Sequence, residues 1–472
     1  MNSNKQSLFT KSFIASALAL SASYVNAAAF QIAEVSSSGL GRAYAGEAAI
    51  ADNAAVVATN PALMSLFKTK QFSMGGVYVQ SRININGEVN VNAGLFHGIE
   101  TGKGDQKNIV PSAVIPNMYF VAPINDKFAV GAGMNVNFGL QSKYKKDYDA
   151  GVLGGTTALN SINLNLSGSY RVSKGLSVGA GLNAVYAKAK IERHAGILKD
   201  ALGTVGQIVQ RQGQGQSGGF VIRVDPASRQ VLAALAKIKV DSDTSIIQLQ
   251  DNNAWGFSWN IGAVYEFNQG NRIGIAYHSK VDINFKDDDA LSYQLKPGKI
   301  SPVKEKGGLT LHLPDYFEIS GFHQLTEKFA MHYSYKYTKW SRLQSLHATY
   351  DNGKVAFHKD EKFHDSSRVA LGATYNVNDK LTLRAGIAYD ESADHPSASI
   401  PDTDRTWYSL GATYNFTPNL SVDVGFAHLR GKKQQFRETQ NIGKEIKLVN
   451  ISADYQSTAR ANLYGLNLNY RF

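Results

Sequence analysis

The chain has 472 residues, and its 49 lysines and arginines against 38 acids give a formal net charge of +11. It contains no cysteine, which excludes a disulfide framework, a zinc–thiolate site and a thiol nucleophile. A mean hydropathy of −0.24, with abundant tyrosine and glycine, indicates either a soluble β protein or an outer-membrane barrel.

The first 27 residues predict a secretory signal peptide. Lys5 and Lys11 are basic, residues 13–20 are apolar, and Val25–Asn26–Ala27 has the small-residue pattern of a cleavage site. The apolar run is far shorter than the roughly 20 residues that a membrane-spanning helix needs. We therefore expect cleavage after Ala27. For a secreted chain we expect no nucleic-acid partner.

Residues 28–69 are the one long segment after the signal peptide that does not alternate between apolar and polar side chains. The segment is rich in alanine, glycine and serine, and it carries a helix-start signal at Asn60–Pro61–Ala62. Asparagine caps helices, and proline suits the first helical turn. Because the rest of the chain, 70–472, reads as strands, we expect a mostly helical plug inside a barrel. This segment is called the hatch below.

After the hatch, every second residue is apolar in segment after segment, which is typical of strands with one greasy face. The clearest case runs from Trp255 to Phe267, and the last strand ends in an aromatic, Phe472. The pattern predicts an all-β fold, a 14-stranded antiparallel transmembrane β-barrel. The expected strands lie near 71–86, 111–124, 128–140, 160–172, 176–191, 254–267, 272–285, 308–324, 329–349, 363–377, 381–389, 406–416, 420–430 and 458–472.

Two kinds of connection separate these strands. Six are short and turn-like, near residues 126, 174, 270, 327, 379 and 418, and the others are long and polar. Short turns at one end and long loops at the other are the layout of an outer-membrane barrel. The longest loop, Glu192–Asn253, has an apolar helical face around Ile197–Val209 that needs a partner, either another loop or a hydrophobic ligand.

Several motifs together resemble the FadL family, the long-chain fatty acid transporters of Gram-negative outer membranes. Within that family the chain is similar to the branch of abundant surface antigens. The resemblance covers almost the whole chain after the signal peptide. The matching stretches are SSSGLGRAYAGEAAIADNAAVVATNPAL in the hatch, PNMYFVAPIND, NLNLSG, NAVYAKAKIERHAG, WGFSWNIG, IPDTDR and the closing NLYGLNLNYRF.

The resemblance implies a route for a hydrophobic ligand. A groove between the loops Glu192–Asn253 and Lys286–Gly307 would catch it first, and a pocket inside the barrel would take it next. Movement of the hatch, anchored at Asn60, Pro61 and Ala62, would then open a path. The exit would be a sideways gap at a kink in the third strand, which matches Asn137, Phe138 and Gly139.

The resemblance also implies polar residues for the carboxylate head of a fatty acid. Arg193 matches a basic residue near the internal pocket, and Asp365 and Arg405 match an internal charged pair. A structural role is the alternative for each of the three residues. For Asp365 and Arg405 the two roles stay equally open, whereas Arg193 favours the ligand role.

The leading hypothesis is an outer-membrane channel for hydrophobic molecules, with long-chain fatty acids as the first candidate cargo. The alternatives are a surface adhesin that binds a host receptor through its loops, and a general porin. Lipid and lipopolysaccharide are the expected surroundings, and we expect a monomer. No HExxH or P-loop motif occurs, and no nucleophile elbow stands out, so we expect no enzyme activity, metal or cofactor.

Overall fold

The computed structural model describes residues 31–472 except 94–95, 214–229, 231–232, 235–236, 297–298, 394–395 and 443–448. The expected signal peptide, 1–27, lies outside the described residues. Within the described part of the chain, no helix is long and apolar enough to cross a membrane.

Among the described residues the helical elements are few, all but α4 are short, and the rest of the regular structure is strand. The helices are α2 (Ser37–Gly41), α3 (Val56–Thr59), η1 (Pro61–Leu66), α4 (Leu198–Gly213) and η2 (Trp340–Arg342). The strands are β1 (Gln71–Ala93), β2 (Phe96–Lys103), β3 (Ala113–Pro123), β4 (Phe128–Asn135), β5 (Gly139–Lys143), β6 (Thr156–Arg171), β7 (Leu176–His194), β8 (Ser245–Asn268), β9 (Asn271–His278), β10 (Val281–Lys296), β11 (Lys299–Leu313), β12 (Tyr316–Gln324), β13 (Phe329–Thr338), β14 (Ser345–Tyr350), β15 (Val355–Asp360), β16 (Ser366–Asn376), β17 (Leu381–Asp390), β18 (Arg405–Asn415), β19 (Leu420–Gly431), β20 (Gln434–Ile442) and β21 (Val449–Arg471).

The strands form one closed antiparallel barrel. Its seam is the pairing of β1 with β21, which runs from Gln71↔Arg471 to Ala93↔Val449. Five barrel strands are each interrupted once, namely β4–β5, β9–β10, β11–β12, β13–β14 and β15–β16. The strands β2 and β20 belong to outer hairpins. The wall formed by the described residues therefore has 14 strands, which confirms the predicted fold.

The barrel wall has apolar side chains on its outer face and polar side chains on its inner face, the reverse of a soluble protein. Along β8, Trp255, Phe257, Trp259 and Ile261 are all exposed, whereas Asn260, between two of them, is 1 % exposed. Apolar side chains that face outward suit lipid, and polar side chains that face inward suit a lumen. Strands of this kind complete their backbone hydrogen bonds with neighbouring strands, as the bilayer requires.

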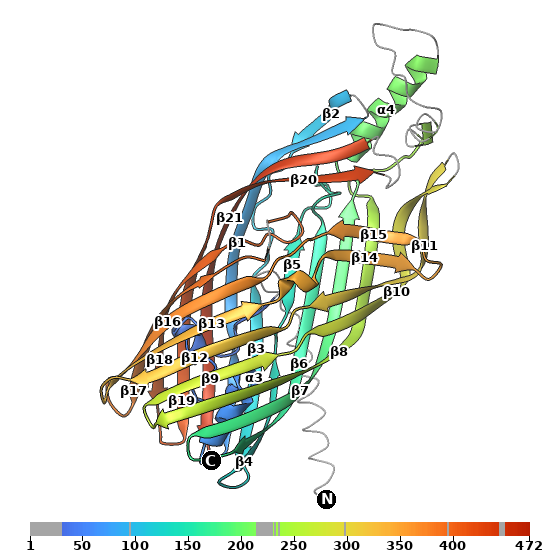
Figure 1. The fold of residues 1–472 in the computed structure, drawn as a ribbon. Helices are drawn as coiled ribbons and strands as arrows, with labels where there is room; N and C mark the ends of the chain where they lie inside the picture. The colour runs from blue at the N-terminus through green and yellow to red at the C-terminus, as the bar shows by residue number, and fades with distance from the viewer. Residues whose placement is uncertain are drawn as a thin grey trace, which may run out of the picture.

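The two ends of the barrel differ as predicted. Each of the six expected short turns separates two consecutive strands, and these turns lie at the end that holds the C-terminus (Figure 1). Helix α4 and the strands β2 and β20 lie at the opposite end (Figure 1). This second end carries the long connections and is the outer end.

The long connections contain more strand than the sequence predicts. β1 was expected to end near residue 86 but reaches Ala93, and β8 begins at Ser245 rather than near 254. The reason is that the hairpins continue to pair beyond the apolar zone, where alternation of side chains no longer marks a strand. The predicted helical face near Ile197 is present as α4. The third strand, expected near 128–140 with a kink at 137–139, is interrupted between β4 and β5.

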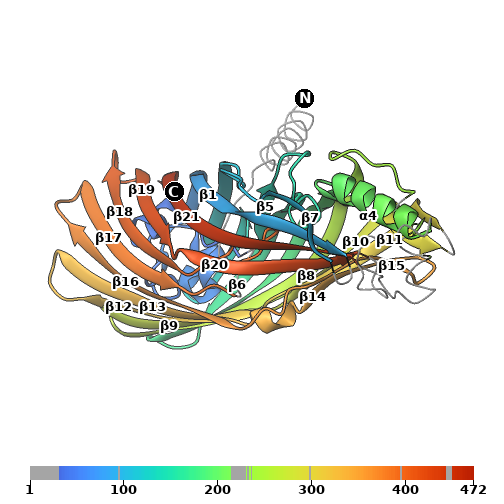
Figure 2. The same cartoon turned by 90° about the horizontal axis from the view of Figure 1, so that it is seen from above.

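The hatch lies inside the barrel, where strands surround α2, α3 and η1 (Figure 2). Leu40, Val57, Leu63 and Met64 of the hatch are fully buried. They pack against the inner faces of wall residues such as Tyr119. The lumen beside the hatch is thus filled by side chains rather than left as an open pore.

Candidate functional site: a gap in the wall, a hatch and an internal pocket

The third barrel strand breaks between Asn135 and Gly139. On the side of β6 the pairing resumes after the break, from Asn135↔Asn163 to Gly139↔Asn160. Four steps along the third strand therefore match three along β6, which is the one extra residue of a bulge. On the side of β3 the pairing stops at Met118↔Met134 and does not resume among the described residues. Residues 113–117 of β3 thus border a gap in the wall.

The start of the described chain lies against this gap. Gln31 and Phe138 form an isolated antiparallel bridge, and the amide of Ile32 donates to the carbonyl oxygen of Asn137 at 2.9 Å. A Cβ atom added at Gly139 would lie 2.9 Å from Cδ1 of Ile32, so glycine gives the segment room. The predicted kink residues Asn137, Phe138 and Gly139 therefore hold the first residues of the hatch.

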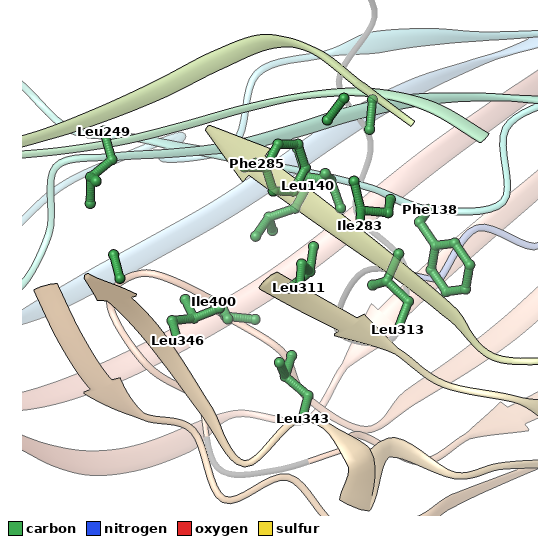
Figure 3. Packing of buried hydrophobic residues seen from close by; sticks show 14 of the residues in the cluster. Phe138, Leu140, Leu249, Ile283, Phe285, Leu311, Leu313, Leu343, Leu346 and Ile400 are labelled. Atoms are coloured by element: carbon green, nitrogen blue, oxygen red, sulfur yellow. The ribbon is translucent and has the colours of Figure 1, made fainter. Parts of the chain in front are cut away.

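Large apolar side chains surround the inner side of the break. Figure 3 shows Phe138 and Leu140 of the interrupted strand gathered with Ile283, Phe285 and other residues from β10, β11 and the outer loops. Phe138 is 5 % exposed. The outer half of the lumen next to the gap is therefore apolar, whereas the wall elsewhere faces inward with asparagine and serine.

Asn60, Pro61 and Ala62 fix the hatch to the wall. The side-chain oxygen of Asn60 accepts from the amide of Ala62 at 3.0 Å, which caps η1 as the sequence predicts. Its side-chain nitrogen donates to the carbonyl oxygens of Ala48 at 2.7 Å and Ala263 at 3.1 Å. One buried amide thus joins the helix start, an earlier hatch turn and strand β8.

Glycines in the wall let the hatch come this close. A Cβ atom at Gly262 of β8 would lie 2.0 Å from the side-chain oxygen of Asn60, and one at Gly179 of β7 would lie 2.5 Å from the amide nitrogen of Ala62. Neither position can hold a side chain while the hatch is seated. These contacts explain why glycine occurs here in strands that otherwise favour larger residues.

An ion-pair network also joins hatch and wall. Arg42, whose side chain is 4 % exposed, bonds Glu47 and Asp52 at 2.7 Å each. Arg384 of β17 reaches the same Asp52 at 3.3 Å. Removing one partner of a buried pair leaves a charge without compensation, which costs several kcal/mol. The network therefore favours the seated position of the hatch.

An internal pocket lies beside Arg405, on the outer side of the hatch. Its space measures about 450 Å³ with its open mouth included. Ile83, Leu140, Ile400 and Leu429 supply apolar lining, and Arg405 supplies a cation. The pocket thus combines an apolar surface with charged groups, since Arg460 and Asp402 line it as well.

The structure does not pair Asp365 with Arg405. Arg405 instead bonds Asp390, its directly opposite neighbour on β17, at 3.1 Å, and Asp402 lies 3.9 Å away. Asp365 accepts from the hydroxyl of Tyr337 at 2.7 Å and lies just before β16. Cross-strand register therefore gives Arg405 a closer acid, and Asp365 does not line the pocket.

Arg193 is buried but already bonded. Its guanidinium donates to the carbonyl oxygens of Thr156 and Glu192 and to the hydroxyls of Thr157 and Ser399, all within 3.0 Å. Ser399 belongs to the loop between β17 and β18 that also supplies Ile400 to the pocket. In this geometry Arg193 holds that loop, and a ligand carboxylate has to displace existing bonds to reach it.

Sequence reasoning missed Glu34, a hatch residue near the pocket. Its side chain is 1 % exposed, and neither carboxylate oxygen has a hydrogen-bond partner among the described residues. Burial raises the pKa of Glu34 to about 7, although the nearby positive charges of Arg405 and Arg368 oppose the rise. An acid in a stretch of alanine and serine was the available signal.

A second space lies at the outer end. It measures about 330 Å³, again with its mouth included, and is formed by β7, β8, β10 and β11. Ile191, Leu249, Phe285 and Leu309 line it together with Lys190 and Lys286. This space lies at the base of the two loops between which the sequence predicts a capture groove.

Comparison with known proteins identifies the family. A family model described as "Outer membrane protein transport protein (OMPP1/FadL/TodX)" matches residues 18–472. "Outer membrane protein P1" of Haemophilus influenzae is 59% identical over 98% of this chain and 99% of its own. The "Long-chain fatty acid transport protein" of Escherichia coli strain K12 is 43% identical over 99% of this chain and 100% of its own.

A solved structure shares the fold. A FadL homologue of Pseudomonas aeruginosa superposes with a TM-score of 0.73, at 20% identity, over 94% of this chain and 100% of its own. The comparisons agree with an all-β barrel in a Gram-negative outer membrane. The chain therefore belongs to the outer membrane transport proteins of the OMPP1/FadL/TodX family, which are channels for hydrophobic substrates rather than enzymes.

Proposed function

We propose that this protein carries long-chain fatty acids across the outer membrane and releases them sideways into the bilayer. The observation that carries the proposal is the gap between β3 and the interrupted third strand, next to an apolar cluster that includes Phe138 and Leu140. Each methylene removed from water stabilises the buried chain by roughly 0.8 kcal/mol. An acyl chain therefore favours an apolar exit into the bilayer over a water-filled one.

The proposed route has two resting places. The outer space with Ile191 and Leu249 receives the acyl chain first. Lys190 and Lys286 line it together with Asp251 and Asp287, so its recognition of the cargo is chiefly apolar. The internal pocket follows, where Arg405 offers the head group a charged hydrogen bond once it exchanges with Asp390. We propose that Arg193 acts on this pocket through its bonds to the loop of Ser399.

The hatch is the proposed gate. Gln31 and Ile32 occupy the inner side of the gap, so the segment has to leave Phe138 and Asn137 before a ligand passes. Asn60, Pro61 and Ala62 would stay fixed and act as the anchor about which the first hatch residues move. The filled lumen argues against a general porin, which needs an open pore.

We propose a fatty acid rather than an aromatic hydrocarbon as the cargo because of Arg405. A hydrocarbon has no group for Arg405, whereas a carboxylate completes an ion pair there. Relatives of 40–43% identity are named long-chain fatty acid transport proteins, which supports the same cargo.

Exposed lysines of the outer end, such as Lys145 and Lys432, are proposed to face lipopolysaccharide. The host-receptor alternative stays a prediction that loop exchange would test.

The test is uptake of labelled oleate by a transporter-deficient Gram-negative strain that expresses the protein. Wild type is expected to restore uptake, and Gly139→Arg is expected to reduce it at least tenfold, because the new side chain fills the gap next to Ile32. Gly203→Arg on α4, where the added Cβ meets nothing within 4 Å, is the matched control and should transport normally. Equal folded amounts in the membrane are checked by heat-modifiable migration on gels.

Two results would contradict the proposal. Absence of uptake by wild type removes fatty acids as cargo. Normal uptake by Gly139→Arg removes the lateral exit and leaves the cargo standing.

A further inference from the structure

A pair of histidines lies on the outer hairpin formed by β14 and β15. His347 and His358 are directly opposite each other in the register of the two strands. Leu346 and Ala348, the neighbours of His347, are buried, so the histidines point to the outer surface. The hairpin lies farther toward the outer end than β13 (Figure 1).

The two rings face each other through the same nitrogen. Nδ1 of His347 lies 2.9 Å from Nδ1 of His358, and the ring planes are 76° apart. The other nitrogen of His358, Nε2, lies 3.0 Å from Oδ1 of Asp360, which is on the same face of the strand. The three side chains thus form a chain of contacts across the surface of the hairpin.

The carboxylate decides which nitrogen of His358 is free. Because an ionised carboxylate only accepts hydrogen bonds, Nε2 of His358 has to carry the proton. The neutral ring therefore has a lone pair on Nδ1, directed at the ring of His347. A carboxylate behind a histidine is the arrangement that orients histidine ligands in metal sites.

We propose that His347 and His358 bind a divalent transition-metal ion of the zinc, nickel or copper class, one Nδ1 from each ring. Two nitrogens at about 2.05 Å from one ion lie about 2.9 Å apart at a right angle and about 3.3 Å apart at a tetrahedral angle. The observed separation of 2.9 Å matches the first of these distances. Both rings have to rotate by roughly 35–45°, because each lone pair must turn from the N–N axis toward the ion. Imidazole nitrogen suits all three metals.

When the ion binds, the Nδ1 proton of His347 moves to Nε2 of the same ring, so both rings stay neutral and both Nδ1 atoms offer a lone pair to the ion. Asp360 keeps His358 in the required tautomer and adds a negative charge near the ion. The two imidazole nitrogens are the ligands that the described residues supply, and no group of three or more potential ligands occurs among them. The bound ion would join β14 to β15 at the outer face of the hairpin whose inner face contributes Leu346 and Phe357 to the apolar cluster.

The test is calorimetric titration of zinc chloride into the purified full-length protein in detergent, without an affinity tag. One ion per chain is expected to bind to wild type. His347→Ala and His358→Ala should each weaken binding at least tenfold. Asp360→Asn should weaken it by about tenfold, the usual effect of losing an orienting partner.

The matched control is His312→Ala. His312 is also exposed and also bonds a carboxylate, Asp282, at 2.6 Å, but its directly opposite neighbour is that aspartate rather than a second histidine, so its loss should leave zinc binding unchanged. Spectroscopy of bound Cu²⁺ gives a second readout, in which wild type should show two nitrogen ligands and each alanine variant fewer. Equal zinc affinity in wild type and the double alanine variant would overturn the proposal. So would fewer than two nitrogens on copper in wild type.

Discussion

At the scale of single residues, Glu34 conflicts most with its surroundings. It is almost fully buried in the hatch, without a hydrogen-bond partner among the described residues, and burial raises its pKa to about 7. The seated hatch therefore binds this proton more tightly than a released hatch would. The free energy of seating becomes less favourable as pH rises from 4.5 to about 7, and it changes no further above that range.

Glu34→Gln should remove this dependence, because glutamine has no charge to bury. The variant hatch is expected to stay seated equally well from pH 5 to pH 8, whereas the wild-type hatch should loosen across that range. Hydrogen exchange of the amides of residues 31–36 measures the difference. Glu88→Gln, at an exposed position of β1, is the control and should behave as wild type. Identical pH profiles for wild type and Glu34→Gln would show that Glu34 does not control seating.

At the scale of elements, the sequence predicts the wall strands, which share one repeated pattern, but not the individual contacts between distant strands. Alternation predicts the wall strands, because each repeats the same choice between lipid and lumen. The break at Asn137–Gly139 was expected from resemblance, but the loss of pairing on the β3 side follows from register, which a single strand does not reveal. The partner of Arg405 was missed for the same reason, since Asp390 is its neighbour only after β17 and β18 align.

The hatch shows the same limit. Its helix start at Asn60–Pro61 could be predicted, because capping is local. The bridge between Gln31 and Phe138 could not, because these residues are far apart in sequence and meet only inside a closed barrel. Glu34 was missed because its burial depends on that same long-range closure.

A disulfide between Gln31→Cys and Phe138→Cys tests whether the hatch segment moves. The two residues are directly opposite in the bridge, and the natural chain has no cysteine to compete. Oxidised protein is expected to lose oleate uptake at least tenfold, and reduction should restore it. Each single cysteine variant is the control and should respond to neither treatment. Full uptake by the oxidised double variant would mean that the segment need not leave the gap.

At the scale of the whole molecule, the barrel has a polar inner wall, and the hatch occupies its lumen. The inner wall carries asparagine and serine, such as Asn260 and Ser334, and the hatch fills the space between them. Water and ions would fill the lumen if the hatch were absent. In the proposed mechanism, lateral exit and a filled lumen work together, because the wall would open to lipid while the lumen stays closed to ions.

Removal of residues 31–66 should therefore turn the protein into an ion-conducting pore. In planar bilayers, wild type is expected to show little steady conductance, and the deletion variant a large and stable one. Arg42→Ala, which breaks the ion pairs to Glu47 and Asp52, should give intermediate, flickering conductance because the hatch is less well held. Steady, porin-like conductance of wild type would support the general-porin alternative.

The seam between β1 and β21 has a consequence for the order of events in assembly. Its partners come from opposite ends of the strand region, so Gln71 cannot meet Arg471 until the last strand has been delivered. Until then two long strand edges stay open, and open edges invite pairing with other chains. Closure of the barrel therefore depends on β21, because without this strand the free edge of β1 has no partner.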